Sequence, residues 1–576
     1  MYRARIFCGK INIEYQEDSQ EMKKNWWKES IVYQIYPKSF NDSNGDGIGD
    51  IRGIIEKLDY LKELGVNVLW ISPMLESPQD DNGYDISDYR RIYKDYGTMQ
   101  DYEELLFQAH ERGIKVLMDL VVNHTSDEHQ WFLESKKSKD NPYRDYYIWK
   151  NPVNGKEPNN WGGAFGGSAW EYDNETQMYY LHLFSKKQPD LNWENEKVRQ
   201  EVYDMMKFWC DKGIDGFRMD VINFISKWPS LPDGDPVVGK TLGFCGAEFY
   251  FYGPCLHAYL HEMNRNCFGR GDKEYVTVGE CGGLGIETAK LTTADTRQEL
   301  SMVFNFDHLD NPGHMRFDEY QYDLRKAVKT ILKWQVEYTN HCWPTLLFEN
   351  HDNPRVTSKV DPTDTYTSEI AKLCAVLEMT LKGSPFVYQG QELGMTNTHF
   401  DSMDDVRDVE SINFYNKLVA KGKKPEKALR IINGGSRDHG RTPMQWTAEP
   451  GAGFTDGTPW IGINKNAVRV NAADEAKVPD SVLNDFKRLI ALRHANPALV
   501  YGDFTQLCPE NKNVVCYKRT LDGNTFFVEL NLTGERQNRP YDPVGFQRLY
   551  SNYHDHRDVL MPFEANVYLA EGEAKA

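Results

Sequence analysis

The 576-residue sequence has no apolar run that approaches the roughly 18 residues of a transmembrane helix. Basic residues are also few, with 67 Lys and Arg against 86 Asp and Glu and a formal net charge of −19. Nucleic acids and anionic membrane surfaces attract cationic proteins, so we expect neither as a partner of this chain.

Cysteine is scarce as well, with 10 residues spread singly along the chain and no CxxC pair. This spacing excludes a zinc ribbon and a thioredoxin-like motif, and it is typical of reduced thiols in a cytoplasmic protein. Residues 1–21 contain no continuous apolar run of the kind found in a secretory signal peptide. They are polar and unpatterned, which predicts a disordered N-terminal extension.

The remaining composition, 40% hydrophobic and 27% charged, is that of a globular protein with a sizeable core. From residue 31 onward, short apolar runs alternate with amphipathic helical stretches, a pattern typical of parallel strands joined by crossover helices. Eight strands close a (β/α)8 barrel; a doubly wound sheet with fewer strands is the alternative. The predicted strands are 31–37, 67–72, 114–122, 214–220, 275–280, 302–307, 345–350 and 385–389.

Two stretches interrupt this alternation. Residues 125–189 are rich in Asn, Gly, Trp and Tyr and predict a small inserted domain after strand three, and residues 396–460 form a second insertion after strand eight. Short strands with turn signals near the end predict a C-terminal antiparallel β-sandwich domain. The predicted division is an extension at 1–21, a barrel at 22–124 and 190–490, an inserted domain at 125–189 and a β domain at 491–576.

Polar residues gather where the predicted barrel strands end, and in a barrel these ends converge on one mouth. Three acids, Asp220, Glu280 and Asp352, lie on three different strand ends. A pair of carboxylates is what glycoside hydrolysis requires. A single acid at such a position is usually a helix cap, but three together favour catalysis. The other polar residues at these ends are Asp119, Asn123, His124, Arg218, Asn350 and His351.

The strings DLVVNH, QPDLNWEN, GFRMD, VTVGE and FENHD occur in this order, and the chain resembles the family 13 (alpha-amylase type) glycoside hydrolases. QPDLN, RTPMQW and the final ANVYLA resemble the oligo-1,6-glucosidase and alpha-glucosidase branch. The resemblance covers residues 25–570. It implies a retaining, exo-acting alpha-glucosidase in which Asp220 is the nucleophile, Glu280 the general acid/base and Asp352 the stabiliser of the transition state.

Physical chemistry supports these roles. Arg218 lies two residues before Asp220 on the same face of its strand, so its cation is expected to keep Asp220 ionised. Glu280 follows the apolar run YVTV, and partial desolvation there would raise its pKa toward working pH. The resemblance implies two carboxyls about 5–5.5 Å apart and retention of anomeric configuration.

The resemblance also implies a set of substrate-binding residues. His124 and His351 would bond hydroxyls of the glucose ring being cleaved, and Asp81 with Tyr84 would hold the terminal sugar. Arg441 is expected to pair with Asp81 and close the pocket. The alternatives are metal binding by the two histidines, a plain Asn-Gly turn around Asp81, and core packing of Phe165 and Phe184. The remaining expected pocket residues are Phe165, Phe184, Gln188, Arg218 and Val221.

Residues 42–50, DSNGDGIGD, have the pattern of a calcium-binding loop. Hard oxygen ligands alternate with small residues on a Gly-rich turn. The loop differs from an EF-hand because its twelfth position is Gly53 instead of Glu. We expect structural calcium, or magnesium in its place, and no organic cofactor; a plain polar turn is the alternative. The expected ligands are Asp42, Asn44, Asp46, Asp50 and the carbonyl of Ile48.

Val221, which follows the predicted nucleophile, implies a preference for alpha-1,6 linkages, since Thr accompanies alpha-1,4 cleavage in enzymes that resemble this one. Alternatives are an alpha-1,4-preferring maltase and a sucrose-active transglycosylase or isomerase. The isomerases carry an Arg-rich stretch after strand six, where this chain reads NFDHLDNPGHMRFDEY. A trehalose 6-phosphate hydrolase would need a cationic phosphate pocket, which the sequence does not reveal. A non-enzymatic ancillary subunit of an amino-acid transporter would need a membrane anchor.

Short alpha-linked oligosaccharides are the expected partners, and the protein is expected to be a monomer or weak homo-oligomer.

Overall fold

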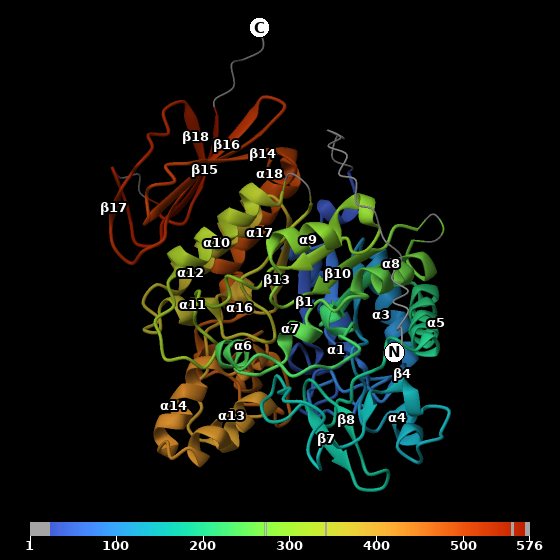
Figure 1. The fold of residues 1–576 in the computed structure, drawn as a ribbon. Coiled ribbons are helices and arrows are strands. Elements are labelled where there is room, and N and C mark those ends of the chain that lie inside the picture. Colours follow the sequence, from blue (N-terminus) through green and yellow to red (C-terminus); the bar gives the residue numbers. More distant parts are fainter. Residues whose placement is uncertain (1–23, 270, 272, 340–341, 555–557, 571–576) are drawn as a thin grey trace.

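The computed structural model describes residues 24–269, 271, 273–339, 342–554 and 558–570, so the extension predicted at 1–21 lies outside the described residues. Eight parallel strands form the predicted barrel at the centre of the molecule (Figure 1). These strands are β1 (Val32–Ile35), β2 (Val68–Ile71), β5 (Lys115–Val121), β9 (Gly216–Asp220), β10 (Val276–Glu280), β11 (Met302–Phe304), β12 (Thr345–Leu346) and β13 (Ser384–Tyr388).

The barrel closes between its sixth and seventh strands. Hydrogen-bonded neighbours run in the order β11-β10-β9-β5-β2-β1-β13-β12. The two outer strands are joined by Thr345, whose Oγ1 donates to the carbonyl of Val303 at 3.1 Å. Strand β12 has only two residues, where the sequence predicts a strand over 345–350, because the chain leaves the sheet after Leu346 and turns toward the mouth.

Alternation along the strands divides their side chains between two apolar clusters. Val68 and Trp70 of β2 lie with Phe304 and Phe386 in one cluster, which fills the barrel interior. Leu69 and the other alternate residues belong to the cluster that includes the surrounding helices. The helices around the barrel are α1 (Ile51–Glu56), α2 (Leu58–Leu64), α3 (Met99–Glu111), α5 (Glu196–Lys212), α6 (Pro236–Leu242), α7 (Ala247–Tyr250), α8 (Leu256–Asn266), α9 (Ile286–Thr293), α10 (Leu324–Glu337), α11 (Val356–Val360), α12 (Thr367–Thr380), α16 (Ala472–Glu475), α17 (Val482–Ala495) and α18 (Pro497–Val500).

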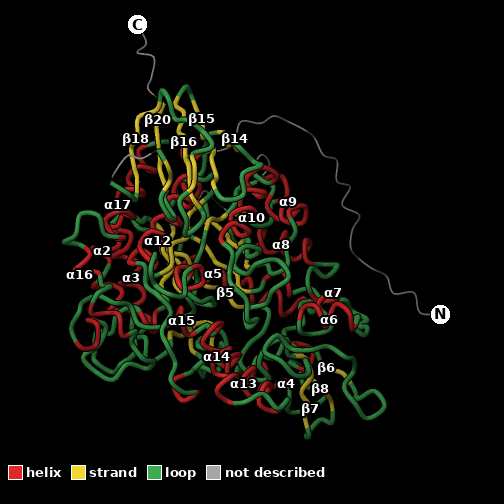
Figure 2. The backbone as a smooth tube through the Cα atoms, turned by 90° about the vertical axis from the view of Figure 1, so that its left-hand side faces the viewer, coloured by secondary structure: helices red, strands yellow, loops and turns green. Residues whose placement is uncertain are grey.

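Both predicted insertions lie at one end of the barrel, opposite the C-terminal sheet (Figures 1 and 2). The first contains α4 (Gln130–Ser135) and a three-stranded sheet in the order β6-β8-β7. The second contains a pair of helices, α13 and α14, followed by the short α15. The bounds of these elements are Trp149–Lys150 for β6, Trp170–Asp173 for β7, Met178–Leu181 for β8, Val409–Ala420 for α13, Pro425–Gly435 for α14 and Asp438–Arg441 for α15. A further two-stranded sheet joins β3 (Leu75–Glu76) to β4 (Asp88–Ile92).

The C-terminal part is antiparallel, as predicted. A five-stranded sheet in the order β14-β15-β16-β20-β18 faces a two-stranded sheet, β17-β19. Leu560 of β19 packs with Phe527 and Tyr568 of the larger sheet, so the two sheets form a small sandwich. The strands are β14 (Asp503–Leu507), β15 (Val514–Leu521), β16 (Asn524–Asn531), β17 (Gln537–Asn538), β18 (Phe546–Ser551), β19 (Val559–Leu560) and β20 (Ala565–Ala570). The residue limits of the domains given above stay a proposal.

Two buried arginines bind the end of α12, and one of them, Arg519, attaches the C-terminal sheet to the barrel. Arg493 of α17 donates to the carbonyls of Met379 and Leu381, where α12 ends, at 3.0 and 2.9 Å. Arg519 of β15 also donates to the last carbonyl of α12, that of Thr380. Cations are favourable at a helix C-terminus, where carbonyl groups lack helical partners.

Among the described helices, none is long and apolar enough to cross a membrane.

Replacing Arg519 with Met should destabilise the protein. The side chain donates to carbonyls of Leu499, Val500 and Gly502 in addition to α12. Each buried acceptor left unsatisfied costs about 1–3 kcal/mol, so the free energy of unfolding should fall by at least about 3 kcal/mol. Calorimetric Tm measures the effect, with the exposed Arg536→Met in the same domain as control. Equal Tm values for the two variants would contradict the attachment role.

Candidate active site

Three acids from three neighbouring strands surround the buried guanidinium of Arg218. Its Nη1 donates to Asp119 Oδ1 and to Asp220 Oδ1, both at 2.8 Å, and its Nη2 pairs with Glu280. Trp70 stacks near the guanidinium, whose carbon lies 4.9 Å from the ring centroid. Strands β5, β9 and β10 therefore bring the predicted nucleophile and acid/base together around one cation.

The pKa values of Asp220 and Glu280 depend on each other. Burial raises the pKa of both carboxyls, and the cation of Arg218 opposes this in each case. Burial and the neighbouring Glu280 act against the expected effect of Arg218 on Asp220, so the ionised state that a nucleophile needs stays a prediction. The pair shares protons as a unit, so the state with one ionised and one protonated carboxyl is favoured.

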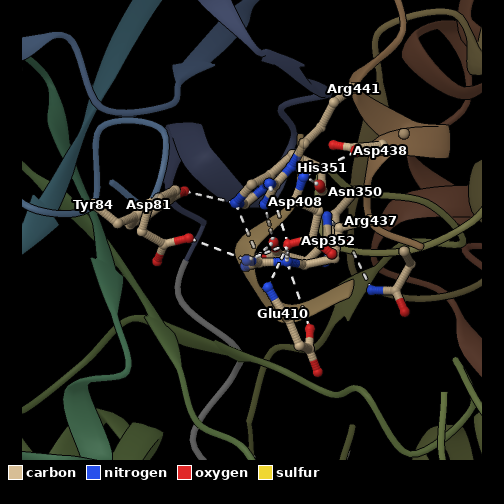
Figure 3. Close-up of polar contacts among 12 residues, drawn as sticks. Asp81, Tyr84, Asn350, His351, Asp352, Asp408, Glu410, Arg437, Asp438 and Arg441 are labelled. Atoms are coloured by element: carbon tan, nitrogen blue, oxygen red, sulfur yellow. Dashed lines mark hydrogen bonds and ion pairs between the residues drawn. The ribbon is translucent and has the colours of Figure 1, made fainter. Parts of the chain in front are cut away.

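Asp352 differs, because a group of cations and a histidine hold it ionised (Figure 3). Burial alone would raise its pKa, but His351, Arg437 and Arg441 together hold the pKa well below its usual range. Arg441 Nη2 lies 2.9 Å and Arg437 Nη1 3.3 Å from Asp352 Oδ1. This carboxylate is thus a fixed negative charge at the mouth.

The predicted pair of Asp81 with Arg441 is replaced by Asp81 with Arg437. Arg437 Nη2 lies 3.1 Å from Asp81 Oδ1 (Figure 3). Arg441 is held elsewhere, since its Nε donates to the carbonyl of His351 at 3.0 Å. Arg437 precedes Arg441 by one helical turn in SRDHGRTPMQW, and this spacing is the signal that could have found it.

Asp81 is also bound from the first insertion. Gln188 Nε2 donates to Asp81 Oδ2 at 3.1 Å and lies 3.2 Å from His124 Nε2. Burial raises the pKa of Asp81 to about 6 despite the cation of Arg437. The predicted pocket residues Asp81, Gln188 and His124 therefore form one contiguous wall.

Both predicted sugar-binding histidines are neutral, because burial lowers the pKa of His124 to about 4 and of His351 to about 3. His351 lies between the rings of Tyr84 and Tyr36, with centroids 5.3 and 6.0 Å away. The Tyr84 hydroxyl lies 2.7 Å from His351 Nε2 and donates to Asp119 at 3.1 Å.

Gln34 of β1 determines which nitrogen of His351 carries the proton, and sequence reasoning missed it. Gln34 Nε2, an amide donor, lies 2.7 Å from His351 Nδ1 in a fully buried contact. Nδ1 must then accept, which places the proton of the neutral ring on Nε2, facing Tyr84 and Asp352. No motif marks Gln34, because the contact joins residues 317 positions apart.

Aromatic rings extend from the pocket into the first insertion. Phe184 lies 5.1 Å from His124 and 5.6 Å from Phe165, measured between ring centroids. The guanidinium carbon of Arg437 lies 4.8 Å from the centre of the Phe165 ring. Contact with His124 and Arg437 favours a pocket position for both phenylalanines over simple core packing.

Val221 has an unusual backbone conformation directly after Asp220. Its φ of 33° and ψ of 41° are left-handed, which is strained for a β-branched residue. The turn directs its side chain into a cluster with Trp161 and Phe224, beside the aromatic rings of the insertion. Such strain concentrates at functional positions.

The predicted calcium loop satisfies its carboxylates with its own amides. Asp42 accepts hydrogen bonds from the N–H groups of Asn44, Gly45 and Gly47 at 2.8–3.0 Å. Asp50 caps α1, accepting from Gly53 N at 2.7 Å. Within the described ranges no three His, Cys, Asp or Glu side chains form a metal-binding group.

With this geometry established, similar proteins place the chain in a family. The alpha-amylase catalytic domain matches residues 34–502. The chain belongs to the alpha-amylase family.

Relatives match nearly the whole of this family member. An oligo-1,6-glucosidase of Bacillus cereus is 52% identical over 95% of this chain and 100% of its own length. The structure of an isomaltulose synthase from Erwinia rhapontici NX5 is similar with a TM-score of 0.91 at 42% identity, over 96% of this chain and 100% of that one. The structure of a Bacillus licheniformis trehalose-6-phosphate hydrolase has a TM-score of 0.87 at 46% identity, covering 95% and 100%.

Asp220→Asn and Glu280→Gln should each lower kcat on an unactivated disaccharide by about two to four orders of magnitude, with Tm nearly unchanged. Because the pKa of Glu280 is raised, its protonated form persists to higher pH than that of a free glutamate. The rate should fall as pH rises through this raised pKa, where the acid loses its proton. Glu280→Gln should lose this basic limb on p-nitrophenyl alpha-glucoside, whose leaving group needs little protonation. Near-normal turnover of the disaccharide by either variant would refute the assignment.

Gln34→Leu should lower kcat/KM up to about 100-fold, because His351 loses the contact that fixes its proton and ring position. Gln34→Glu should act differently: a carboxylate accepting from Nδ1–H raises the pKa of His351 from about 3. Its activity should therefore fall as pH decreases through the new value. The pH profiles of kcat/KM separate the variants, and three identical profiles would exclude this positioning role.

Proposed function

We propose that the chain is a retaining, exo-acting alpha-glucosidase that removes glucose from short alpha-linked oligosaccharides and prefers alpha-1,6 linkages. The observation that carries the proposal is the placement of Asp220 and Glu280 on one guanidinium, opposite a permanently ionised Asp352. Two carboxyls bound to one guanidinium are compatible with the separation of about 5–5.5 Å found in retaining enzymes, whereas inverting enzymes hold theirs farther apart to admit a water molecule.

In the first step, ionised Asp220 attacks the anomeric carbon while the bond to the leaving oxygen breaks. Glu280 gives its proton to that oxygen, so the leaving sugar departs neutral. A water then attacks the glycosyl ester, and Glu280 takes back a proton as Asp220 is released. Two displacements at one carbon retain its configuration. Asp352 stabilises the positive charge that develops on the ring.

Exo action follows from the wall behind this site. The ion pair of Asp81 and Arg437 joins a loop after β2 to the insertion after strand eight, and Gln188 adds a contact from the first insertion. Asn413 of α13 donates to the carbonyl of Phe165 at 3.4 Å, bridging the two insertions. A pocket closed beyond the first sugar accepts only a chain end.

The alpha-1,6 preference is proposed from Val221 and from the oligo-1,6-glucosidases that are about half identical to this chain. A second methyl at this position fills space on the leaving-group side, where Thr would offer a hydroxyl. The alternatives of an alpha-1,4 maltase and of a sucrose isomerase differ in how they treat the leaving sugar.

Two observations favour hydrolysis of neutral glucosides. The stretch after β11 contains a single arginine, Arg316, and this arginine pairs with Glu410 at 2.6 Å. After Glu280 the next cation in sequence is Lys290, which pairs with Glu287 at 2.8 Å. A phosphate on the leaving sugar would lack a free cation in this segment, which disfavours a trehalose 6-phosphate substrate.

Three further expectations remain proposals: structural calcium or magnesium in the loop 42–50, a cytoplasmic location, and a monomeric or weakly oligomeric state. The carboxylates of Asp42, Asp46 and Asp50 accept from backbone amides of the loop and its helix, and an ionised carboxylate retains further lone pairs with which it can bind a cation.

The native enzyme should show a higher kcat/KM for isomaltose than for maltose. Val221→Thr should move this ratio toward maltose by about 10- to 200-fold, the usual range for such a pocket change. Val and Thr are both β-branched, so both are subject to the same backbone strain at position 221. The two proteins then differ only in the hydroxyl that replaces a methyl group. Unchanged kcat on p-nitrophenyl alpha-glucoside serves as control. A native preference for maltose would overturn the linkage assignment.

Chelation with EDTA should lower Tm, and added calcium should restore it, because an ion that binds only the folded state stabilises it by mass action. Turnover of the folded protein should be nearly unaffected. Asp46→Ala should abolish the response to calcium. If Tm stays constant in chelator with metal verified as absent, the loop is a plain polar turn.

A further inference from the structure

A groove separate from the catalytic mouth lies between the first insertion and the loop after β9. It has a volume of about 170 Å³. This is smaller than the roughly 300–1,000 Å³ of sites that enclose a drug-sized ligand, so a ligand held there is no larger than a small unit such as one sugar ring. Its lining includes four aromatic residues, Tyr147, Trp149, Trp193 and Trp228.

Trp228 forms an exposed platform at this groove. It is 45% exposed, whereas most tryptophans of this chain are buried. Its indole meets Phe249 edge to face, with centroids 6.3 Å apart and planes at 82°. With 45% of its surface exposed, the indole keeps apolar area in contact with solvent. The apolar face of a pyranose ring packs on such a surface by burying C–H groups.

Exposed polar side chains surround the platform. The side chains of Asp145, Lys150 and Glu194 line the groove and are exposed. In the described part of the chain, none of the three side chains, nor the indole N–H of Trp228, has a hydrogen bond or ion pair. Carboxylates accept from sugar hydroxyls, and the ammonium and indole groups donate to them.

A buried ion pair holds the groove in place. Lys227, the residue before Trp228, pairs with Asp190 at 2.7 Å and donates to Asn123 Oδ1 at 2.8 Å. Asn123 in turn precedes His124 of the catalytic pocket. The groove is therefore preformed, and the Lys227 contacts lie between it and the active site.

We propose that this groove is a second carbohydrate-binding site, which takes an alpha-linked glucosyl unit of an oligosaccharide. The balance of two carboxylates against one unpaired ammonium disfavours a phosphorylated sugar. The polar rim disfavours a purely apolar ligand. The choice of glucosyl units rests on the proposed function, whereas the presence of a sugar site rests on the groove.

The experiment measures isomaltotriose binding by calorimetry to the Asp220→Asn protein with the active site saturated by 1-deoxynojirimycin. The remaining binding should belong to the groove. Trp228→Ala should weaken it about tenfold or more, equivalent to roughly 1.4 kcal/mol, and Trp228→Phe should retain most of it. Tyr172→Ala, a 38% exposed aromatic of β7 outside the groove lining, is the matched control.

In the otherwise native enzyme, Trp228→Ala should leave kcat/KM on p-nitrophenyl alpha-glucoside and Tm unchanged. No residual isomaltotriose binding, or equal binding in Trp228→Ala and Tyr172→Ala, would overturn the proposal. Failure of the proposed function would look different: the native enzyme would not hydrolyse isomaltose, whatever the groove binds.

Discussion

One buried guanidinium, that of Arg218, is shared by Asp119, Asp220 and Glu280. Three carboxylates cannot be desolvated together without a cation among them, because each buried charge costs several kcal/mol. With that cation in place, the pair of Asp220 and Glu280 can hold a single proton between them. Strands β5, β9 and β10 deliver the three acids to this one cation.

A pair of arginines, Arg437 and Arg441, limits the depth of the site. Arg437 and Arg441 come from the insertion after strand eight, and both reach Asp352, while Arg437 alone reaches Asp81. The barrel supplies the reacting carboxylates, and the insertions close the pocket behind the first sugar. Chemistry and chain-end selectivity therefore come from different segments, as is common for barrels whose loops vary around a constant core.

Backbone strain and preorganised contacts occur where the barrel meets its insertions. Val221 is left-handed immediately after the nucleophile, and Gln34 of β1 fixes the proton of His351. Both features cost stability or conformational freedom, and both hold reacting groups in one geometry before substrate arrives.

The sequence alone determined the eight strands, because their apolar runs alternate with helical periodicity, and it placed Asp220, Glu280 and Asp352 at strand ends. It could not determine which arginine meets Asp81, since Arg437 and Arg441 share a motif and only the path of α15 separates them. Nor could it reveal Gln34, which touches His351 across 317 residues. The pKa values of Asp220 and Glu280 also required the tertiary structure, because burial and the neighbouring charge, which set them, exist only once the strands are assembled. Local sequence patterns indicate strand or helix periodicity and helix caps. Long-range contacts, burial and the sharing of charges arise only when the chain packs.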